Sequence, residues 1–249
     1  MNILLSVSFI GKAYCGWQVQ NNAVSVQETL QKALKEALGG ECPLTGCSRT
    51  DAGVHANQFC CTVRTDGQSK PVPLDKLPEV VNFFLPKDIA VKSARIVPDS
   101  FHPRYDVIRK EYLYRILNTP IRDPFCEGLV YRVPKKLDEE KMAISAVCFL
   151  GKHDFSACMA SGSDIIDCVR TVDSLRVTRK GDEVDVVISA DGFLYNMVRI
   201  IVGTLIEVSH GKIDPSSLPE RISSKDRSRM GFTAPACGLY LNRVEYGNF

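Results

Sequence analysis

The sequence predicts an α+β protein that contains the same βαββαβ unit twice in tandem. Two observations support this class: amphipathic helical segments alternate with short strand-like segments, and their order is β-α-β-β-α-β in each half of the chain. This order defines the split βαβ, or ferredoxin-like, unit. We therefore expect two ferredoxin-like subdomains, over residues 1–102 and 103–249, that form a mixed, mainly antiparallel sheet with a central cleft.

Turn residues and apolar periodicity predict the elements of the first half. A helix begins after the N-cap Ser25 and ends at Gly39, and a second helix is kinked or restarted at Pro78. Two strands flank the polar segment 46–56. The expected elements are a strand over 3–10, a helix over 26–38, strands on both sides of 46–56, a helix over 74–84 and a strand over 89–97.

The second half repeats this order with one extra strand and one short extra helix. Strands are expected over 111–117, 129–133, 169–179, 183–190 and 239–246, and alternation places Tyr112 and Tyr114 on one face. A strongly apolar helix covers 193–209, and the polar segment 214–229 contains a short helix. The amphipathic helix over 138–150 is predicted to use as its apolar positions Met142, Ile144, Val147, Cys148 and Leu150.

The composition of 249 residues, with 45% apolar and 24% charged side chains, is typical of a soluble globular protein. The net charge of +2 neither indicates nor excludes a nucleic-acid partner. The ten cysteines lack paired spacing, and Met1–Leu5 lacks the basic residues of a secretory signal, so we expect free thiols in the cytoplasm.

Metal and membrane binding are both disfavoured by the sequence. The four histidines show no metal-ligand spacing with cysteines or carboxylates, so no metal is expected. The longest apolar run, 193–206, is too short to span a membrane and contains Asn196, Arg199 and Gly203, so no transmembrane helix is expected.

The segment 46–56 places charged side chains among small ones between two strands. Asp51 is followed by Ala52 and Gly53, whose small side chains allow another molecule to come close. Arg49 lies two residues before Asp51 and would point to the same side of an extended chain. An ordinary polar turn remains the alternative interpretation.

Arg199 is the only charged residue between Gly192 and Ile206. A guanidinium in so apolar a helix must reach the surface or meet a carboxylate, because an unpaired buried charge is very costly. One interpretation is a structural ion pair. The other is a pair with Asp51, which would keep that carboxylate ionised and oriented.

Tyr112 lies within a basic stretch. Basic residues interleaved with tyrosines suit the backbone and the stacked bases of a nucleic acid, although a solvated strand edge is equally consistent with the pattern. The basic residues of this stretch are Arg104, Arg109, Lys110 and Arg115.

Seven segments, in order along almost the whole chain, resemble the TruA family of tRNA pseudouridine synthases. The most specific is Arg-Thr-Asp-Ala-Gly-Val-His-Ala at residues 49–56. The segments are Tyr14–Gln18, Gly46–Ala56, Phe101–Tyr105, Lys110–Ile116, Gly151–Phe155, Phe193–Arg199 and Thr233–Leu241.

The resemblance implies the pseudouridine synthase fold and isomerisation of uridine to pseudouridine in the anticodon stem-loop of tRNA, usually at positions 38, 39 and 40. It also implies base flipping, no cofactor or metal, and a homodimer whose basic clefts take the tRNA. Asp51 matches the essential aspartate of the family, and Tyr112 and Arg199 match its other active-site residues. The residues expected to contact the substrate are Arg49, Arg104, Tyr112 and Leu239.

Three alternatives remain open at this point. The same chemistry could act on another position or another RNA, because RNA is read mainly by shape and by a basic surface. A non-catalytic RNA-binding module would also use paired ferredoxin-like sheets. A hydrolase that uses Asp51 would need a second acid or base, and none is evident in these segments.

Overall fold

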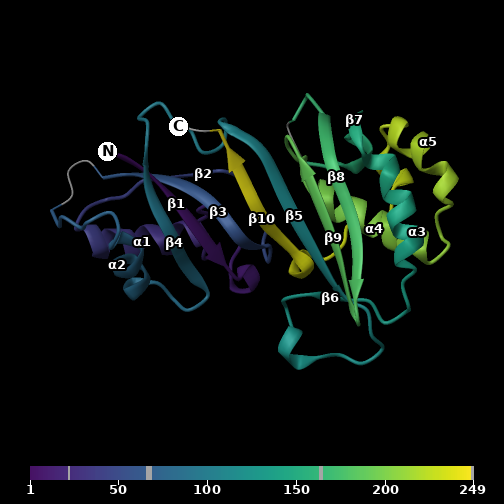
Figure 1. Ribbon diagram of the computed structural model, residues 1–249, viewed down its shortest axis with the longest axis horizontal. Coiled ribbons are helices and arrows are strands. Elements are labelled where there is room, and N and C mark those ends of the chain that lie inside the picture. The colour runs from purple at the N-terminus through teal and green to yellow at the C-terminus, as the bar shows by residue number, and fades with distance from the viewer. Residues whose placement is uncertain (22, 66–68, 163–164, 248–249) are drawn as a thin grey trace. The chain divides into compact units, whose positions relative to one another are not determined.

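The computed structural model describes residues 1–21, 23–65, 69–162 and 165–247 and shows an α+β protein (Figure 1). Its contacts divide the chain into two compact units. Residues 1–108 and 240–249 form the first unit, and residues 109–239 form the second. The strand pairings are both parallel and antiparallel, with antiparallel ones in the majority, as predicted.

The first unit contains the βαββαβ order that the sequence predicts. Strand β1 pairs antiparallel with both β3 and β4, and β2 pairs antiparallel with β3. The elements are β1 (Asn2–Phe9), α1 (Val26–Leu38), β2 (Leu44–Gly46), β3 (His55–Arg64), α2 (Leu77–Phe84) and β4 (Ile89–Val97), joined by the last strand of the chain, β10 (Leu239–Tyr246).

The two helices of this unit pack against each other (Figure 1). Helix α1 has the expected caps: the Ser25 hydroxyl accepts a hydrogen bond from the N–H of Glu28 at 3.2 Å, and Gly39 is left-handed, with φ of 74°. Helix α2 begins at Leu77 instead of residue 74, so Pro78 lies at its start and not inside it. In this first turn, the N–H that proline lacks has no partner within the helix.

Strand β10 belongs by its contacts to the first unit, although the expected subdomain 103–249 includes it. It pairs in parallel with β3, and Tyr240 lies opposite His55. Local alternation predicts that such a strand exists but does not identify its partner. The predicted subdomains 1–102 and 103–249 describe the repeated βαββαβ order and are not the same as the two compact units. This division and the central cleft stay predictions.

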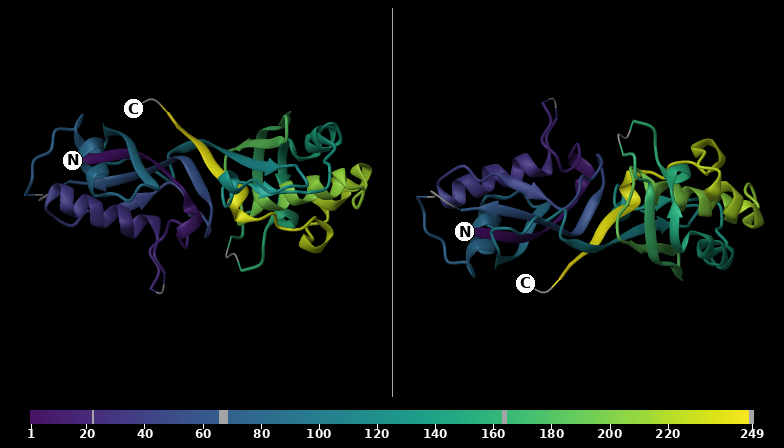
Figure 2. Two further views of the ribbon diagram at one scale, coloured as in Figure 1. Left: turned by 90° about the horizontal axis from the view of Figure 1, so that it is seen from below. Right: turned by 90° about the horizontal axis from the view of Figure 1, so that it is seen from above.

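The second unit contains a sheet in the order β5-β9-β8-β7, antiparallel throughout, with β6 in parallel beside β5. Its three helices lie beside β8 and β9 in the views of Figures 1 and 2. Strand β7 was not predicted, because its four residues lack apolar alternation. The elements are β5 (Val107–Leu117), β6 (Tyr131–Arg132), α3 (Glu139–Ala146), β7 (Gly151–Asp154), β8 (Val169–Lys180), β9 (Glu183–Ala190), α4 (Met197–Ser209) and α5 (Leu218–Ser223).

The apolar face predicted for residues 138–150 is partly wrong. Helix α3 ends at Ala146 and continues as a 3-10 turn, and the side chains of Ile144 and Val147 are 72% and 62% exposed. The buried positions are Met142, Ser145, Ala146 and Phe149, with the spacing i, i+3, i+4 and i+7. A serine fits this face because its hydroxyl donates to the carbonyl of Lys141 at 2.7 Å. Helix α4 likewise begins at Met197, four residues later than expected.

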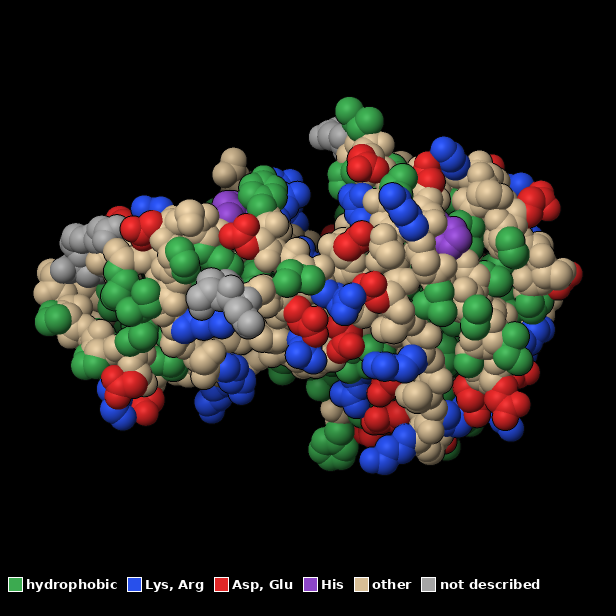
Figure 3. All heavy atoms as spheres, turned by 45° about the horizontal axis from the view of Figure 1, so that its top comes forward, with side chains coloured by type: hydrophobic (Ala, Val, Ile, Leu, Met, Phe, Trp, Pro, Cys, Tyr) green, Lys and Arg blue, Asp and Glu red, His purple; other side chains and the backbone are tan. Residues whose placement is uncertain are grey.

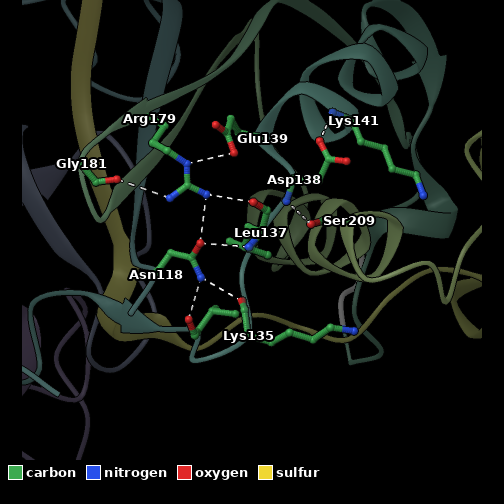
Figure 4. Close-up of polar contacts among 10 residues, drawn as sticks. Asn118, Lys135, Leu137, Asp138, Glu139, Lys141, Arg179, Gly181 and Ser209 are labelled. Carbon is green, nitrogen blue, oxygen red and sulfur yellow. Dashed lines mark hydrogen bonds and ion pairs between the residues drawn. The ribbon is translucent and has the colours of Figure 1, made fainter. Parts of the chain in front are cut away.

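A buried asparagine joins the end of β5 to the start of α3 (Figure 4). The Asn118 amide nitrogen donates to the carbonyls of Val133 at 2.8 Å and Lys135 at 2.9 Å. Its oxygen accepts from the N–H of Leu137 and from the Arg179 guanidinium, both at 2.9 Å. One side chain therefore satisfies four polar groups of the connection between β5 and α3 and of strand β8.

Arg179 extends this network from β8. Its guanidinium donates to the carbonyl of Leu137 at 3.0 Å, and its Nε forms an ion pair with Glu139 Oε2 at 2.9 Å, in a geometry that is not that of a hydrogen bond. Backbone hydrogen bonding to the Glu139 carboxylate and the nearby positive charge of Arg179 lower the pKa of the Glu139 carboxyl. The charge of Arg179 is thus placed at the first turn of α3, next to a carboxylate.

We expect the Asn118→Ala substitution to lower the free energy of unfolding by about 2–3 kcal/mol, because it leaves several buried backbone groups without partners. The matched control is Asn57→Ala, which removes an exposed amide with one side-chain bond to Asn242 at 2.8 Å. The control should change the free energy by no more than about 0.5 kcal/mol. Urea denaturation measures both, and equal effects would contradict the role of Asn118.

All ten cysteines are free thiols, as expected. The described residues include no helix that is long and apolar enough to cross a membrane. On the face shown in Figure 3, basic and acidic side chains are intermixed instead of forming one large basic area. Any charge-based recognition on that face therefore depends on local clusters.

Candidate active site

The loop 47–54 connects β2 to β3 and carries Arg49 and Asp51. The N–H of Cys47 donates to the carbonyl of Cys60 at 2.8 Å, which extends the β2–β3 pairing by one residue. Arg49 is exposed and Asp51 is half-buried. The predicted catalytic carboxylate and its neighbouring cation thus lie on the loop between β2 and β3.

A second segment, residues 11–17, holds this loop in place. The N–H of Trp17 donates to the carbonyl of Thr50, and the N–H of Gly53 donates to the carbonyl of Tyr14, both at 3.3 Å. The two loop residues in these bonds, Thr50 and Gly53, lie on either side of Asp51 in the sequence. The backbone on both sides of the carboxylate is therefore fixed by another part of the chain.

Two glycines permit this close approach of the two segments. Gly16 has φ of +101°, and a Cβ there would lie 2.2 Å from the carbonyl oxygen of Thr50. A Cβ on Gly46 would lie 2.5 Å from Nε1 of Trp17, whose indole stacks on Phe59 with 4.0 Å between ring centroids. Side chains at either glycine would separate the loop from the segment that holds it.

His55 has a structural role in this arrangement. It is fully buried, its Nδ1 accepts a hydrogen bond from the N–H of Gly11 at 2.9 Å, and its ring stacks on Tyr240 at 4.6 Å between centroids. An accepting Nδ1 carries no proton, so the neutral ring has its hydrogen on Nε2. His55 thus joins the 11–17 segment to the first residue of β3.

The buried thiols beside the loop are not nucleophiles. Cys47 and Cys60 lie opposite each other, and the N–H of Cys60 approaches the sulfur of Cys47 at 3.4 Å. Burial raises the pKa of the Cys60 thiol to about 12. Because the thiolate is the reactive form, Cys60 is not a nucleophile at neutral pH, and the catalytic role of Asp51 stays a prediction.

A surface pocket of about 240 Å³ lies next to loop 47–54 and brings together Arg49 and Arg104, two of the predicted substrate-binding residues. We call it the Arg49–Arg104 pocket. The pocket is also lined by aromatic side chains for which the sequence predicted no role, Trp17, His102 and Tyr105. The sequence signal that could have indicated a role is a tyrosine, Tyr105, directly after the arginine Arg104.

In the second unit, Tyr112 lies on β5 and Arg199 on α4. Tyr112 is buried on the same face as Tyr114, as predicted, and meets Phe193 edge to face with 4.9 Å between ring centroids. The Arg199 Nε donates to the carbonyl of Ala234, and its Nη1 donates to the side chain of Asn196, both at 2.7 Å. Arg199 is thus half-buried and oriented by polar contacts.

The segment that contacts Arg199 lies directly against α4. A Cβ on Gly203 would lie 1.8 Å from the carbonyl oxygen of Phe232, and the N–H of Gly231 donates to the hydroxyl of Thr204 at 3.0 Å. Leu239, at the end of this segment, is buried. Its predicted contact with substrate and the pairing of Arg199 with Asp51 both stay predictions.

The residues that the structure describes contain no cluster of three or more histidine, cysteine or acidic side chains with the geometry of a metal site. The absence of a metal and of a cofactor in the reaction stays a prediction.

We expect Gly16→Ala to loosen loop 47–54, because the new Cβ displaces the carbonyl of Thr50. Amide hydrogen exchange of the loop should accelerate, and the protein should lose about 2 kcal/mol or more of stability. The control is Gly181→Ala, at φ of +62° with no atom within 4 Å, which adds backbone strain without a clash. Unchanged exchange of the loop in Gly16→Ala would show that the 11–17 segment does not hold it.

The comparisons with known proteins agree with the motifs. A family model described as tRNA pseudouridine synthase matches residues 5–106 and 145–247, so it covers both halves of the chain. The tRNA pseudouridine synthase A of Thermoanaerobacter sp. (strain X514) is 45% identical over 245 residues, covering 98% of this chain and 99% of the relative. The tRNA pseudouridine synthase A 2 of Clostridium tetani is 40% identical, with 98% of both chains covered. This chain therefore belongs to the TruA family of tRNA pseudouridine synthases.

Proposed function

We propose that this chain isomerises uridine to pseudouridine in the anticodon stem-loop of tRNA, at positions 38, 39 and 40. Family membership makes the chain a tRNA-modifying isomerase. The observation that carries the proposal is the fixed loop 47–54, which presents Asp51 beside a pocket with two guanidinium groups. A carboxylate needs such cations close by if it is to meet a polyanionic substrate.

The reaction can be written on the target nucleotide alone. The C1′–N1 glycosidic bond breaks, the detached uracil turns, and its C5 joins C1′. C5 then loses its proton and N1 gains one, so that the product is an isomer of the substrate. This balance requires no oxidant and no group donor, which supports a reaction without cofactor or metal.

Asp51 is the catalytic carboxylate in this proposal. Attack by Asp51 on the sugar or on the base splits one difficult step into two easier ones. Removal of a sugar proton by Asp51 is the third role consistent with a carboxylate at this position. Tyr112 stacks on the uracil and assists removal of the C5 proton, and its edge-to-face contact with Phe193 supports a fixed ring orientation.

Arg199 acts as the positioning residue for Asp51. A guanidinium next to a carboxylate keeps it ionised and fixes its direction. The hydrogen bonds of Arg199 to Ala234 and Asn196 support this role, because they restrict the guanidinium before any substrate arrives.

The target base has to leave its stack to reach Asp51. Arg49, two residues away, takes the space left by the flipped base or holds its phosphate, while Arg104 and Leu239 add contacts to the RNA. We further propose that the protein acts in the cytoplasm as a homodimer, with tRNA as the partner of each copy.

The direct test is tritium release from tRNA transcripts labelled with [5-³H]uridine, followed by mapping of the modified positions. We expect release by the wild type and none by Asp51→Ala or Asp51→Asn, because the carboxylate is needed for bond cleavage. Release at positions other than 38, 39 and 40 would contradict the proposed target. Release by both Asp51 variants would remove Asp51 from the mechanism.

A second test addresses Arg199. We expect Arg199→Met to reduce the single-turnover rate about 100-fold, since an unpaired carboxylate is less ionised and less well placed. Arg176→Met, at an exposed position on β8, is the matched control. A folded Arg199→Met enzyme with full activity would contradict the pairing.

A further inference from the structure

The Arg49–Arg104 pocket has the electrostatic character of an anion site. The guanidinium groups of Arg49 and Arg104 are exposed, and neither forms an ion pair with a carboxylate of the described residues. None of the described side chains that line the pocket is acidic. Two uncompensated cations at one pocket repel each other, so an anion that bridges them is strongly favoured.

The ring of His102 is oriented by the turn 102–106. The Nδ1 of His102 accepts hydrogen bonds from the N–H groups of Arg104 at 3.1 Å and Tyr105 at 3.4 Å. The N–H of His102 in turn donates to the side chain of Asp106 at 2.9 Å. Because Nδ1 is an acceptor, the neutral ring carries its proton on Nε2. His102 therefore contributes a ring of fixed orientation to the lining of a pocket that already has two guanidinium groups.

The same turn presents an aromatic platform. Tyr105 is 74% exposed, yet its ring is held by stacking on His102, with 4.3 Å between centroids and 29° between planes. The guanidinium carbon of Arg104 lies 5.9 Å from the ring centroid. An exposed aromatic face suits a nucleic-acid base, and only an unstacked base offers a free face to it.

The pocket is close to Asp51 along the chain. Arg49 precedes Asp51 by two residues, so their Cα atoms are at most about 7 Å apart. An RNA strand whose target nucleotide lies at Asp51 therefore brings the next phosphodiester group within reach of Arg49.

We propose that the Arg49–Arg104 pocket binds the nucleotide next to the target uridine in the RNA strand. The phosphodiester group lies between Arg49 and Arg104 with His102 as a further donor, and the base stacks on Tyr105. This assignment rests on the proposed function, since it places the target uridine at Asp51. It adds a second unstacked nucleotide, which only a single-stranded or opened part of the RNA supplies.

The test is a thermodynamic cycle between the protein and the RNA. Anticodon stem-loops are prepared intact, with an abasic nucleotide on the 5′ side of the target, and with one on the 3′ side. The half-saturating enzyme concentration for single-turnover tritium release is measured for wild type, Tyr105→Ala and Tyr105→Phe. We expect Tyr105→Ala to raise the half-saturating concentration about tenfold on intact RNA. Tyr105→Phe keeps the ring and its stacking, so it should leave this concentration unchanged.

The decisive result is the combination of the two changes. With the wild type, an abasic nucleotide on one side of the target should raise the half-saturating enzyme concentration by a factor similar to that of Tyr105→Ala. With Tyr105→Ala, the same abasic nucleotide should raise this concentration no further. If the wild type releases tritium but the effects of Tyr105→Ala and of the abasic nucleotide multiply independently on both sides of the target, the proposal is overturned. No tritium release by the wild type on intact RNA would instead overturn the proposed function.

Two matched controls separate the pocket from general surface effects. Phe83→Ala removes an aromatic ring that is 83% exposed on α2, outside the pocket, and should not change the half-saturating concentration. Arg104→Gln should reduce the dependence of log affinity on log salt by about 0.7, as expected for one lost contact to a single-stranded phosphate. The exposed Lys92→Gln on β4 should leave this slope unchanged, and equal slopes for the two variants would count against the phosphate contact.

Discussion

The backbone hydrogen bonds between segment 11–17 and loop 47–54 are the constraint on which the candidate site depends. The loop has no regular secondary structure, and fixing such a segment costs about 1–2 kcal/mol of conformational entropy per residue. The bonds at Thr50 and Gly53, together with the buried His55, meet this cost during folding instead of during substrate binding. Preorganised charges are more effective in catalysis, because they need no rearrangement when the substrate arrives.

The second unit orients its predicted site residue by a similar device. Arg199 is held through the segment 231–234, which can lie against α4 because Gly203 and Gly231 have no side chains. Elsewhere in this unit, Asn118 and Arg179 satisfy the polar groups between β5, β8 and α3. In both units, hydrogen bonds to backbone groups from a distant part of the sequence orient a predicted site residue or the loop that carries it.

The sequence predicts the features that depend on local pattern. The caps of α1, the buried face that Tyr112 shares with Tyr114, and the position of Asp51 between two strands all follow from neighbouring residues, and the structure confirms them.

Features that depend on tertiary partners were not predictable. The exposure of Ile144 and Val147 follows from which face of the segment packs against α4 and β8, and the parallel pairing of β10 with β3 joins residues far apart in sequence. The role of His55 as a buried hydrogen-bond acceptor required knowledge of Gly11 in space. The aromatic side of the Arg49–Arg104 pocket likewise combines segments separated by more than fifty residues.

The proposed reaction requires that loop 47–54 hold Asp51 at the glycosidic bond of a flipped uridine. The most direct measurement is a crystal structure of the Asp51→Asn variant bound to an anticodon stem-loop. We expect the target nucleotide to be unstacked, with its C1′ next to residue 51 and the guanidinium of Arg199 in contact with the same side chain. A target uridine that remains stacked in the RNA, or that lies against another part of the protein, would contradict the account.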